Sequence, residues 1–289
     1  MSTVPAASLE PIPTVRIKPG RGWAPVNLKE IWVYRELLYF LVWRDVKVRY
    51  KQTILGGLWA ILQPFFTMIV FTIFFSKLAG IGSDGVPYPI FSYAGLLSWN
   101  FFAQALSQSS SSIVTDASLI TKVYFPRLVI PISAVLAGVV DFAVAFVLLI
   151  GMMAYYHLWP SAAVVYLPLL LLLAVAAALG VGLWLSALNV QYRDVRYVIP
   201  FFIQIWLFVT PVIYPGSKVA AKLKEIGLPP WLYGLNPMAG VVEGFRWALI
   251  RTPPPSASVL ITSTTVTILL LVSGAFYFSR MERGFADIV

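Results

Sequence analysis

Long apolar runs separated by short polar stretches occupy most of the chain. The runs cover residues 57–78, 90–109, 128–156, 162–188, 197–214 and 257–279. Each is long enough to cross the hydrocarbon core of a bilayer, which needs a run of about 18 residues or more. The second run also carries Asn100, Gln104, Ser107 and Gln108, which indicates a helix that faces a polar path or partner helices. The pattern therefore predicts an all-α polytopic membrane protein with six transmembrane helices.

The segment before the first run has two parts. Residues 1–26 are rich in Pro, Ser and Ala and lack the apolar core of a signal peptide, so we expect a flexible cytoplasmic tail. From Asn27 onward apolar residues recur at helical spacing, and Asn27 with Glu30 resembles a capping box. Because the opposite face carries charged side chains, residues 27–43 are predicted to form an amphipathic helix that lies in the membrane interface.

Residues 215–250, between the fifth and sixth runs, are partly apolar but interrupted. Asn236-Pro237 and Gly240 break the apolar pattern there. Non-helical backbone can lie at membrane depth only where protein or a watery cavity surrounds it. The segment is therefore predicted to form a re-entrant extracytoplasmic hairpin before the last helix.

Composition agrees with the apolar pattern. Hydrophobic residues make up 59% of the 289 residues and charged residues 11%, and the mean hydropathy is +0.82. These values lie outside the range of a soluble domain, so we expect an integral membrane protein. The net charge of +9 comes from cations that flank the apolar runs. Membrane topology explains that placement better than nucleic-acid binding does.

The positions of Lys and Arg predict the orientation. With the amino terminus in the cytoplasm, most of them lie on the cytoplasmic side, so both termini are expected there. The same assignment puts two similar phrases at the inner surface, RDVKVRY at 44–50 and QYRDVRYVIP at 191–200. Because acidic residues contribute little to topology, Asp45 and Asp194 are expected to pair with neighbouring arginines or to cap helix ends.

Few residues suggest chemistry of their own. The chain has no cysteine and a single histidine, His157, which excludes disulfides, thiol catalysis and a metal site made only of histidines. The phosphate-loop lookalike at residues 80–85 continues with Val86-Pro87, where a nucleotide-binding loop needs Lys and Ser or Thr. We therefore predict no catalytic residue, no metal and no cofactor in this chain. Uphill transport would need energy from a partner or an ion gradient.

Three ionisable residues stand out within the apolar pattern. Asp141 lies in the middle of the third run, where a charged group is costly enough to count as a functional-site hypothesis. The alternatives are a protonated carboxyl group, or one satisfied by a serine or glutamine of a neighbouring helix. Glu243 and Arg246, three residues apart, are predicted to form an ion pair that fixes the hairpin or latches a gate.

Five stretches in order along the chain carry a family resemblance. They are WRDVKVRYKQTILGGLWAILQPFF (43–66), YAGLLSWNFFAQAL (93–106), LITKVYFPRLVIPIS (119–133), TPVIYP (210–215) and LNPMAGVVEGFRWAL (235–249). Together they resemble the membrane subunit of ATP-binding-cassette (ABC) type-2 polysaccharide exporters, the Wzm-like and teichoic-acid-exporter permeases. The resemblance implies a single ABC type-2 transmembrane domain over residues 27–289.

The resemblance also implies partners and a substrate. It implies a homodimer in the bacterial cytoplasmic membrane, bound to two copies of a cytoplasmic ABC ATPase that holds ATP and Mg²⁺. The exported substrate would be a polysaccharide linked to a polyprenyl diphosphate lipid, O-antigen-like or alternatively teichoic acid, galactan or capsule. A membrane enzyme acting on polyprenyl-linked glycans would need acidic metal ligands or a phosphate-binding cluster. An ion-coupled transporter would need inverted repeats and several intramembrane acids.

The family's coupling helix, which docks in a groove of the ATPase, resembles residues 119–127. Apolar side chains would anchor it, cations would surround them, and Pro126 would end the helix before the third run. The second Arg-Asp phrase would make a further contact. An ordinary cytoplasmic turn is the alternative. The residues expected at these contacts are Leu119, Ile120, Lys122, Val123, Tyr124, Phe125, Pro126, Arg127, Arg193, Asp194 and Arg196.

The first Arg-Asp phrase is expected to recruit the substrate lipid. Cations left over after pairing would bind lipid phosphates or the diphosphate, for which the planar fork of arginine is well suited. Generic cations at the membrane surface are the alternative. The residues assigned to this role are Arg44, Lys47, Arg49 and Lys51.

Aromatic residues are candidates for the sugar path, because the apolar CH face of a sugar stacks on a ring. The alternative is that Trp and Tyr concentrate at membrane interfaces whatever the substrate. The residues assigned to the path are Phe65, Phe66, Trp99, Phe102, Trp206 and Tyr214. By resemblance residues 215–250 form an outer gate, with Trp231, Tyr233, Glu243 and Arg246 as its side chains.

Overall fold

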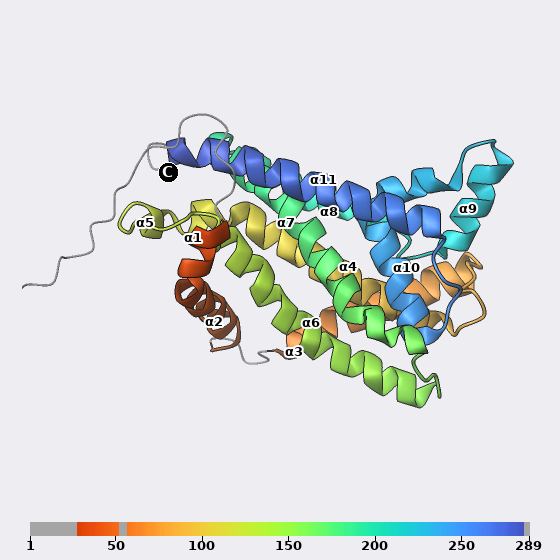
Figure 1. Ribbon diagram of the computed structural model, residues 1–289. Helices are drawn as coiled ribbons and strands as arrows, with labels where there is room; N and C mark the ends of the chain where they lie inside the picture. The colour runs from red at the N-terminus through yellow and green to blue at the C-terminus, as the bar shows by residue number, and fades with distance from the viewer. Residues whose placement is uncertain (1–27, 52–56, 286–289) are drawn as a thin grey trace, which may run out of the picture.

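The computed structural model describes residues 28–51 and 57–285 (Figure 1). Every regular element within these two ranges is a helix, which confirms the predicted all-α class. The predicted tail at 1–26 and the capping residue Asn27 lie outside the described residues.

Six helices of the described chain run along the bundle in alternating directions (Figure 1). Each overlaps one of the six predicted spans. They are α3 (Leu58–Phe71) with its π-helical continuation η1 (Thr72–Leu78), α4 (Tyr88–Thr115), α6 (Val129–Tyr155), α7 (Leu167–Gln191), α8 (Val195–Val209) and α11 (Ala257–Met281).

Four of these stretches are long and apolar enough to cross a membrane. They are Leu58–Leu78, Val129–Tyr155, Ala162–Gln191 and Ala257–Met281, the third of which includes the 3-10 helix η2 (Ala162–Tyr166). The chain is therefore a multi-pass membrane protein. Helix α4 is long but rich in polar residues, and α8 has only 15 residues, fewer than a perpendicular span needs. The count of six spans stays a prediction.

A cluster of buried apolar residues joins one end of the bundle. Leu41 of the amino-terminal helix packs there with Ile113 of α4, Val129 of α6, Val190 of α7 and Phe278 of α11. Figure 1 shows α1 (Leu28–Val33), α2 (Arg35–Lys51) and α5 (Ala117–Ile120) at this end, with α9 (Gly216–Glu225) at the other. Both Arg-Asp phrases therefore lie at the same end of the molecule.

The amino-terminal helix extends further than its prediction. A turn at Tyr34 separates α1 from α2, and α2 continues past Trp43 to Lys51, because the phrase RDVKVRY contains no helix breaker. Instead of lying free on a surface, α2 packs along α6. Trp32 of α1 and Tyr39, Phe40 and Trp43 of α2 are exposed, as expected for helices at a membrane interface.

The segment at 215–250 forms a helical hairpin at the end opposite to α1. It comprises α9, the 3-10 helix η3 (Pro230–Leu235) and α10 (Pro237–Ile250). The Asn236 side chain accepts a hydrogen bond from the Met238 N–H at 3.0 Å and so caps α10. Most of α10 is buried against α4, α7 and α11. The depth of this hairpin in the membrane stays a prediction.

Helices α7 and α11 approach closely at two glycines. A β-carbon on Gly180 would lie 2.7 Å from the Leu271 backbone nitrogen, and one on Gly274 would overlap the Gly180 carbonyl oxygen. Small residues allow such backbone contact between membrane helices.

We expect Gly274→Ala to force α7 and α11 apart and to lower the free energy of unfolding by about 1–3 kcal/mol. Thermal denaturation of the detergent-purified protein measures this. The matched control is Gly151→Ala on α6, where a β-carbon meets nothing within 4 Å. Equal melting temperatures for the two variants would contradict the close contact.

Candidate functional site

Three regions of the structure carry most of the charged residues selected from the sequence. We call them the polar seam (α2 against α4 and α6), the coupling loop (residues 121–128) and the outer pocket (beside α9 and α10).

Asp141 lies at the centre of the polar seam. Its residue is 8% exposed, and its carboxylate forms an ion pair with Arg49 of α2. It also accepts hydrogen bonds from the Tyr50 hydroxyl and, at 3.0 Å, from the Gln104 amide. A carboxylate satisfied by a glutamine was one of the predicted alternatives, and it is confirmed. A buried charge is costly unless it is paired, and Arg49 and Tyr50 complete that pairing.

Arg44 forms the second ion pair of the seam. It contacts both Asp45, its neighbour in the phrase, and Asp116 beyond the end of α4, each at 2.8 Å. The predicted ion pair within the first Arg-Asp phrase is therefore confirmed. The hydrogen bond to Asp116 raises the pKa of the Arg44 guanidinium above its usual value, although partial burial opposes the shift. The group stays charged at every physiological pH.

The seam encloses a groove of about 350 Å³ between α2, α4 and α6. Its polar wall comes from one face of α4, with Gln108, Ser111 and Thr115, and its charged wall from Arg44 and Arg49. Gln108 also accepts a hydrogen bond from Arg49. The polar character of the second apolar run thus serves contacts with α2.

The predicted lipid-recruiting cations divide into two kinds. Carboxylates within the chain already neutralise Arg44 and Arg49. Lys47 and Lys51 are exposed and lie one helical turn apart, and the Lys47 ammonium lies 4.2 Å from the centre of the Trp43 ring. Of the four assigned cations, the two lysines therefore present the accessible charge.

The coupling loop is less helical than predicted. Helix α5 ends at Ile120, and residues 121–128 form turns, so the predicted helix over 119–127 is wrong beyond that point. Lys122, Val123 and Tyr124 are exposed, with Tyr124 64% exposed. The loop projects from the end of the bundle beside α5 (Figure 1).

Ile120 and Phe125 are not exposed at the surface of the described chain. Both are buried in the cluster around Leu41. Their assignment to the ATPase contact stays a prediction. Leu119 and Pro126 are half-buried, and the Arg127 guanidinium donates a hydrogen bond to the Glu282 carbonyl, which ties the loop to the end of α11.

The second Arg-Asp phrase has no internal ion pair among the described residues. Arg193, Asp194 and Arg196 are all exposed, and Asp194 precedes α8 without a side-chain capping bond. Arg196 instead donates to the Tyr197 hydroxyl at 2.8 Å. The predicted role of Asp194 as an ion-pair partner or cap is wrong, and the arginines of the phrase remain on the surface.

Two of the aromatic residues assigned to a sugar path belong to the core. Trp99 and Phe102 are buried, and their ring centres lie 6.3 and 5.0 Å from that of Trp206. Both side chains are thus covered within the single chain, and their assignment to a sugar path stays a prediction. Trp206 is partly buried and donates to the Asn236 side chain at 3.1 Å, which joins α8 to the cap of α10.

The other aromatic residues occupy more open positions. Phe66 and Trp231 are exposed, and Phe65 packs partly against the core. The Tyr214 side chain is half-buried, and its hydroxyl donates to the Phe208 carbonyl at 2.9 Å. These four stay candidates for contact with a sugar chain.

Arg246 holds the hairpin to the rest of the bundle. The residue is 2% exposed, and its guanidinium donates to the backbone carbonyls of Phe91, Pro211 and Val212. It also lies 3.6 Å from the centre of the Phe91 ring. No ion pair joins Arg246 to Glu243 in the described structure, so that prediction is wrong. The Arg246 guanidinium donates to backbone carbonyl groups of other segments instead of to the Glu243 carboxylate, which the local spacing predicted as its partner.

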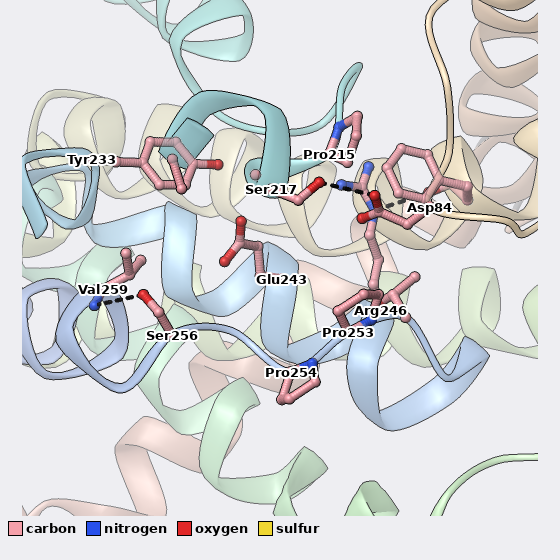
Figure 2. A pocket seen from close by; sticks show the side chains of 14 residues that line it. Asp84, Pro215, Ser217, Tyr233, Glu243, Arg246, Pro253, Pro254, Ser256 and Val259 are labelled. Carbon is pink, nitrogen blue, oxygen red and sulfur yellow. Dashed lines mark hydrogen bonds between the residues drawn. The ribbon is translucent and has the colours of Figure 1, made fainter. Parts of the chain in front are cut away.

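The outer pocket lies beside Arg246 (Figure 2). Its volume is about 150 Å³, and its polar walls include Asp84, Ser217, Tyr233 and Glu243. The Ser217 hydroxyl donates to the Asp84 carboxylate at 2.9 Å, which connects α9 to the loop before α4.

The fold and these regions define a helical, multi-pass membrane protein with a charged surface at one end and, at the other, a helical hairpin whose helix α10 is buried. The sequence profile of the ABC-2 type transporter family matches residues 36–250. The chain belongs to that family.

Individual relatives match over nearly their whole length. The O-antigen export system permease protein RfbA of Myxococcus xanthus is 30% identical over 261 residues, which is 90% of this chain and 98% of the relative. RfbA of Klebsiella pneumoniae is 27% identical over 88% of this chain and 95% of its own. The polysialic acid transport protein KpsM of Escherichia coli is 24% identical over 83% of this chain and 91% of its own.

Tyr50, Gln104 and Gln108 belong to the seam although no prediction assigned them to it. The two glutamines carried a usable signal, since they lie one helical turn apart in an apolar run. They therefore mark a face that needs polar partners. Tyr50 carried no such signal in the sequence, because its contact with Asp141 depends on where α2 packs.

We expect Asp141→Asn to lower the free energy of unfolding by about 2 kcal/mol, because hydrogen bonds to a charged group are lost and Arg49 loses its counter-charge. Thermal denaturation in detergent measures the change. Asp45→Asn is the matched control and should cost less, since Arg44 keeps Asp116. An Asp45→Asn variant that is as unstable as Asp141→Asn would refute the special role of the buried pair.

Proposed function

We propose that this chain is the membrane subunit of an ABC exporter that moves an O-antigen-like polysaccharide, linked to a polyprenyl diphosphate, across the bacterial cytoplasmic membrane. The observation that carries the proposal is the match to O-antigen export permeases over nearly the full length of both chains. A capsule polymer is the second candidate, and the match to the polysialic acid transport protein KpsM favours it. Teichoic acid and galactan are the further alternatives that the family resemblance implies.

In the proposed topology, six helices span the membrane and both termini lie in the cytoplasm. The alternating directions of the six helices support it, as does the gathering of α1, α2, α5 and the end of α11 at one end (Figure 1). The cations of both Arg-Asp phrases lie at that end, which the positive-inside rule assigns to the cytoplasm. The α9–α10 hairpin then lies on the extracytoplasmic side.

The working unit is proposed to be a homodimer. Buried side chains, including Tyr93, Trp99 and Phe102, fill the interior of the described bundle. A polysaccharide therefore needs a path at the surface of one chain, which a second copy would close. Exposed apolar residues on α3 and α8, among them Phe66 and Phe201, provide surface for that copy or for lipid.

A separate cytoplasmic ATPase, with its ATP and Mg²⁺, is proposed to dock on the coupling loop. The support is an exposed apolar pair, Val123 and Tyr124, beside Lys122 and at the same end as Arg193 and Arg196. Interfaces of this kind gain most of their energy from a few such anchors. Leu119, Pro126 and Arg127 hold the loop in position behind them.

Recruitment of the lipid diphosphate is proposed to begin at Lys47 and Lys51. These exposed ammonium groups lie on α2 near the predicted membrane surface and can bind phosphate oxygens without breaking an internal ion pair. Arg44 and Arg49 position the helix through the seam. In the described residues no group of three His, Cys, Asp or Glu side chains is arranged to hold a metal ion.

The purified chain alone should hydrolyse no ATP, and activity should appear when its ATPase partner is added. The physical reason is that the chain lacks the Lys and Ser or Thr of a phosphate-binding loop. Release of phosphate from ATP, with and without the partner, provides the measurement. Robust hydrolysis by the homogeneous chain would contradict the proposal.

Replacing both Val123 and Tyr124 with alanine should weaken ATPase docking by about 2 kcal/mol or more, roughly 30-fold in affinity. Co-purification of the two subunits measures the loss. The control is Tyr155→Ala at the far end of α6, where the side chain is 78% exposed. If the double variant keeps full ATPase stoichiometry and full export, the coupling loop is not the docking site.

A further inference from the structure

The outer pocket contains a buried hydroxyl group without a well-placed partner. Tyr233 is 9% exposed, and its hydroxyl makes no hydrogen bond of normal geometry in the described structure, although the Glu243 carboxylate lies close enough for a weak hydrogen bond. In Figure 2 the hydroxyl points into the pocket toward Glu243 and Ser217. Buried hydroxyl groups are nearly always hydrogen-bonded, and Glu243 meets this need only in part, so a better-placed acceptor would complete it.

The charges around the pocket restrict what can supply that acceptor. Asp84 and Glu243 bring two carboxylates to its wall, and Arg246 brings one buried guanidinium. A phosphate or another anion would face both carboxylates. A metal cation or an amine would face the guanidinium, which is fixed by its three backbone carbonyls. A neutral ligand with several hydroxyl groups meets neither penalty.

Hydroxyl groups also match the hydrogen-bonding groups of the pocket. A carboxylate only accepts hydrogen bonds, so Asp84 and Glu243 need donors, while the Tyr233 hydroxyl needs an acceptor. A sugar hydroxyl is both donor and acceptor. The remaining wall includes Pro253 and Pro254, whose exposed apolar surfaces suit the CH groups of a sugar ring.

Gly216 keeps the carboxylate in place. A β-carbon at this position would overlap the Glu243 carboxylate oxygen and would also lie 3.1 Å from the Tyr233 ring. Any larger residue at the start of α9 would therefore push Glu243 out of its position in the pocket. The open space beside Glu243 depends on this one residue.

We propose that the outer pocket binds a single neutral sugar residue of the glycan, with Glu243 and Asp84 accepting from its hydroxyl groups and Tyr233 donating to it. The inference rests on the proposed function, because that function supplies the glycan and places the pocket on the extracytoplasmic side. It adds a specific sugar contact at the α9–α10 hairpin, outside the packed core of the bundle.

The first test uses the full-length chain in lipid nanodiscs, with D-glucose, D-galactose, D-mannose and L-rhamnose as separate probes. Saturation-transfer NMR should show contact with at least one of them. Binding should fall at least 10-fold in Tyr233→Phe, in Glu243→Gln and in Gly216→Ala. The matched control Tyr155→Phe, on an exposed tyrosine, should bind as the unmodified chain does.

Stability separates a ligand role for Tyr233 from a structural one. Because its hydroxyl has no well-placed partner in the described structure, Tyr233→Phe should melt at the same temperature as the unmodified chain or higher. Loss of sugar binding at unchanged stability supports the inference. Absence of binding by the unmodified chain to all four sugars would overturn it, as would unchanged binding by Tyr233→Phe.

Surface polymer in cells distinguishes the inference from the proposed function. If deleting the chain leaves surface polymer unchanged, the proposed function fails, and the inference fails with it. If deletion abolishes surface polymer but Tyr233→Phe reduces neither export nor sugar binding, only the inference fails. Reduced export by Tyr233→Phe, together with weaker sugar binding and full export by Tyr155→Phe, supports both.

Discussion

The ion pair between Arg49 and Asp141 determines how the amino-terminal helix α2 packs against α6. An ionised carboxylate inside an apolar bundle must be paired, and its partner here comes from the amino-terminal helix. That requirement holds α2 along α6 and next to the polar face of α4. At the same end of the molecule Ile120 and Phe125 are buried, while Lys47, Lys51 and Tyr124 are exposed.

The same constraint operates at the opposite end through Arg246. Its buried guanidinium satisfies carbonyl groups of α4 and of the turn after α8, so α10 is held between them. Glu243, on the same helix, keeps its carboxylate for the outer pocket. At each end, some charged groups are satisfied within the chain and hold its helices in place. Other polar groups at the same end stay available for a partner, a lipid or a sugar.

The positions of the helices could be predicted from the sequence, but their side-chain partners could not. The runs at 57–78 and 128–156 correspond to helices at Leu58–Leu78 and Val129–Tyr155, because length and hydropathy are local properties. Arg49 and Asp141 are separated by 92 residues, so their pairing depends on packing. The spacing of Glu243 and Arg246 predicted an ion pair, but the arginine donates hydrogen bonds to backbone carbonyls far away in sequence instead.

The most direct measurement of the proposed export is the location of the polymer in cells that lack this chain. If the chain moves a finished polymer, lipid-linked polysaccharide should accumulate inside the cytoplasmic membrane and disappear from the cell surface. Supplying the chain again should restore surface polymer. Normal surface polymer without the chain would contradict an export role, and a complete absence of lipid-linked polymer would indicate an enzyme of its synthesis instead.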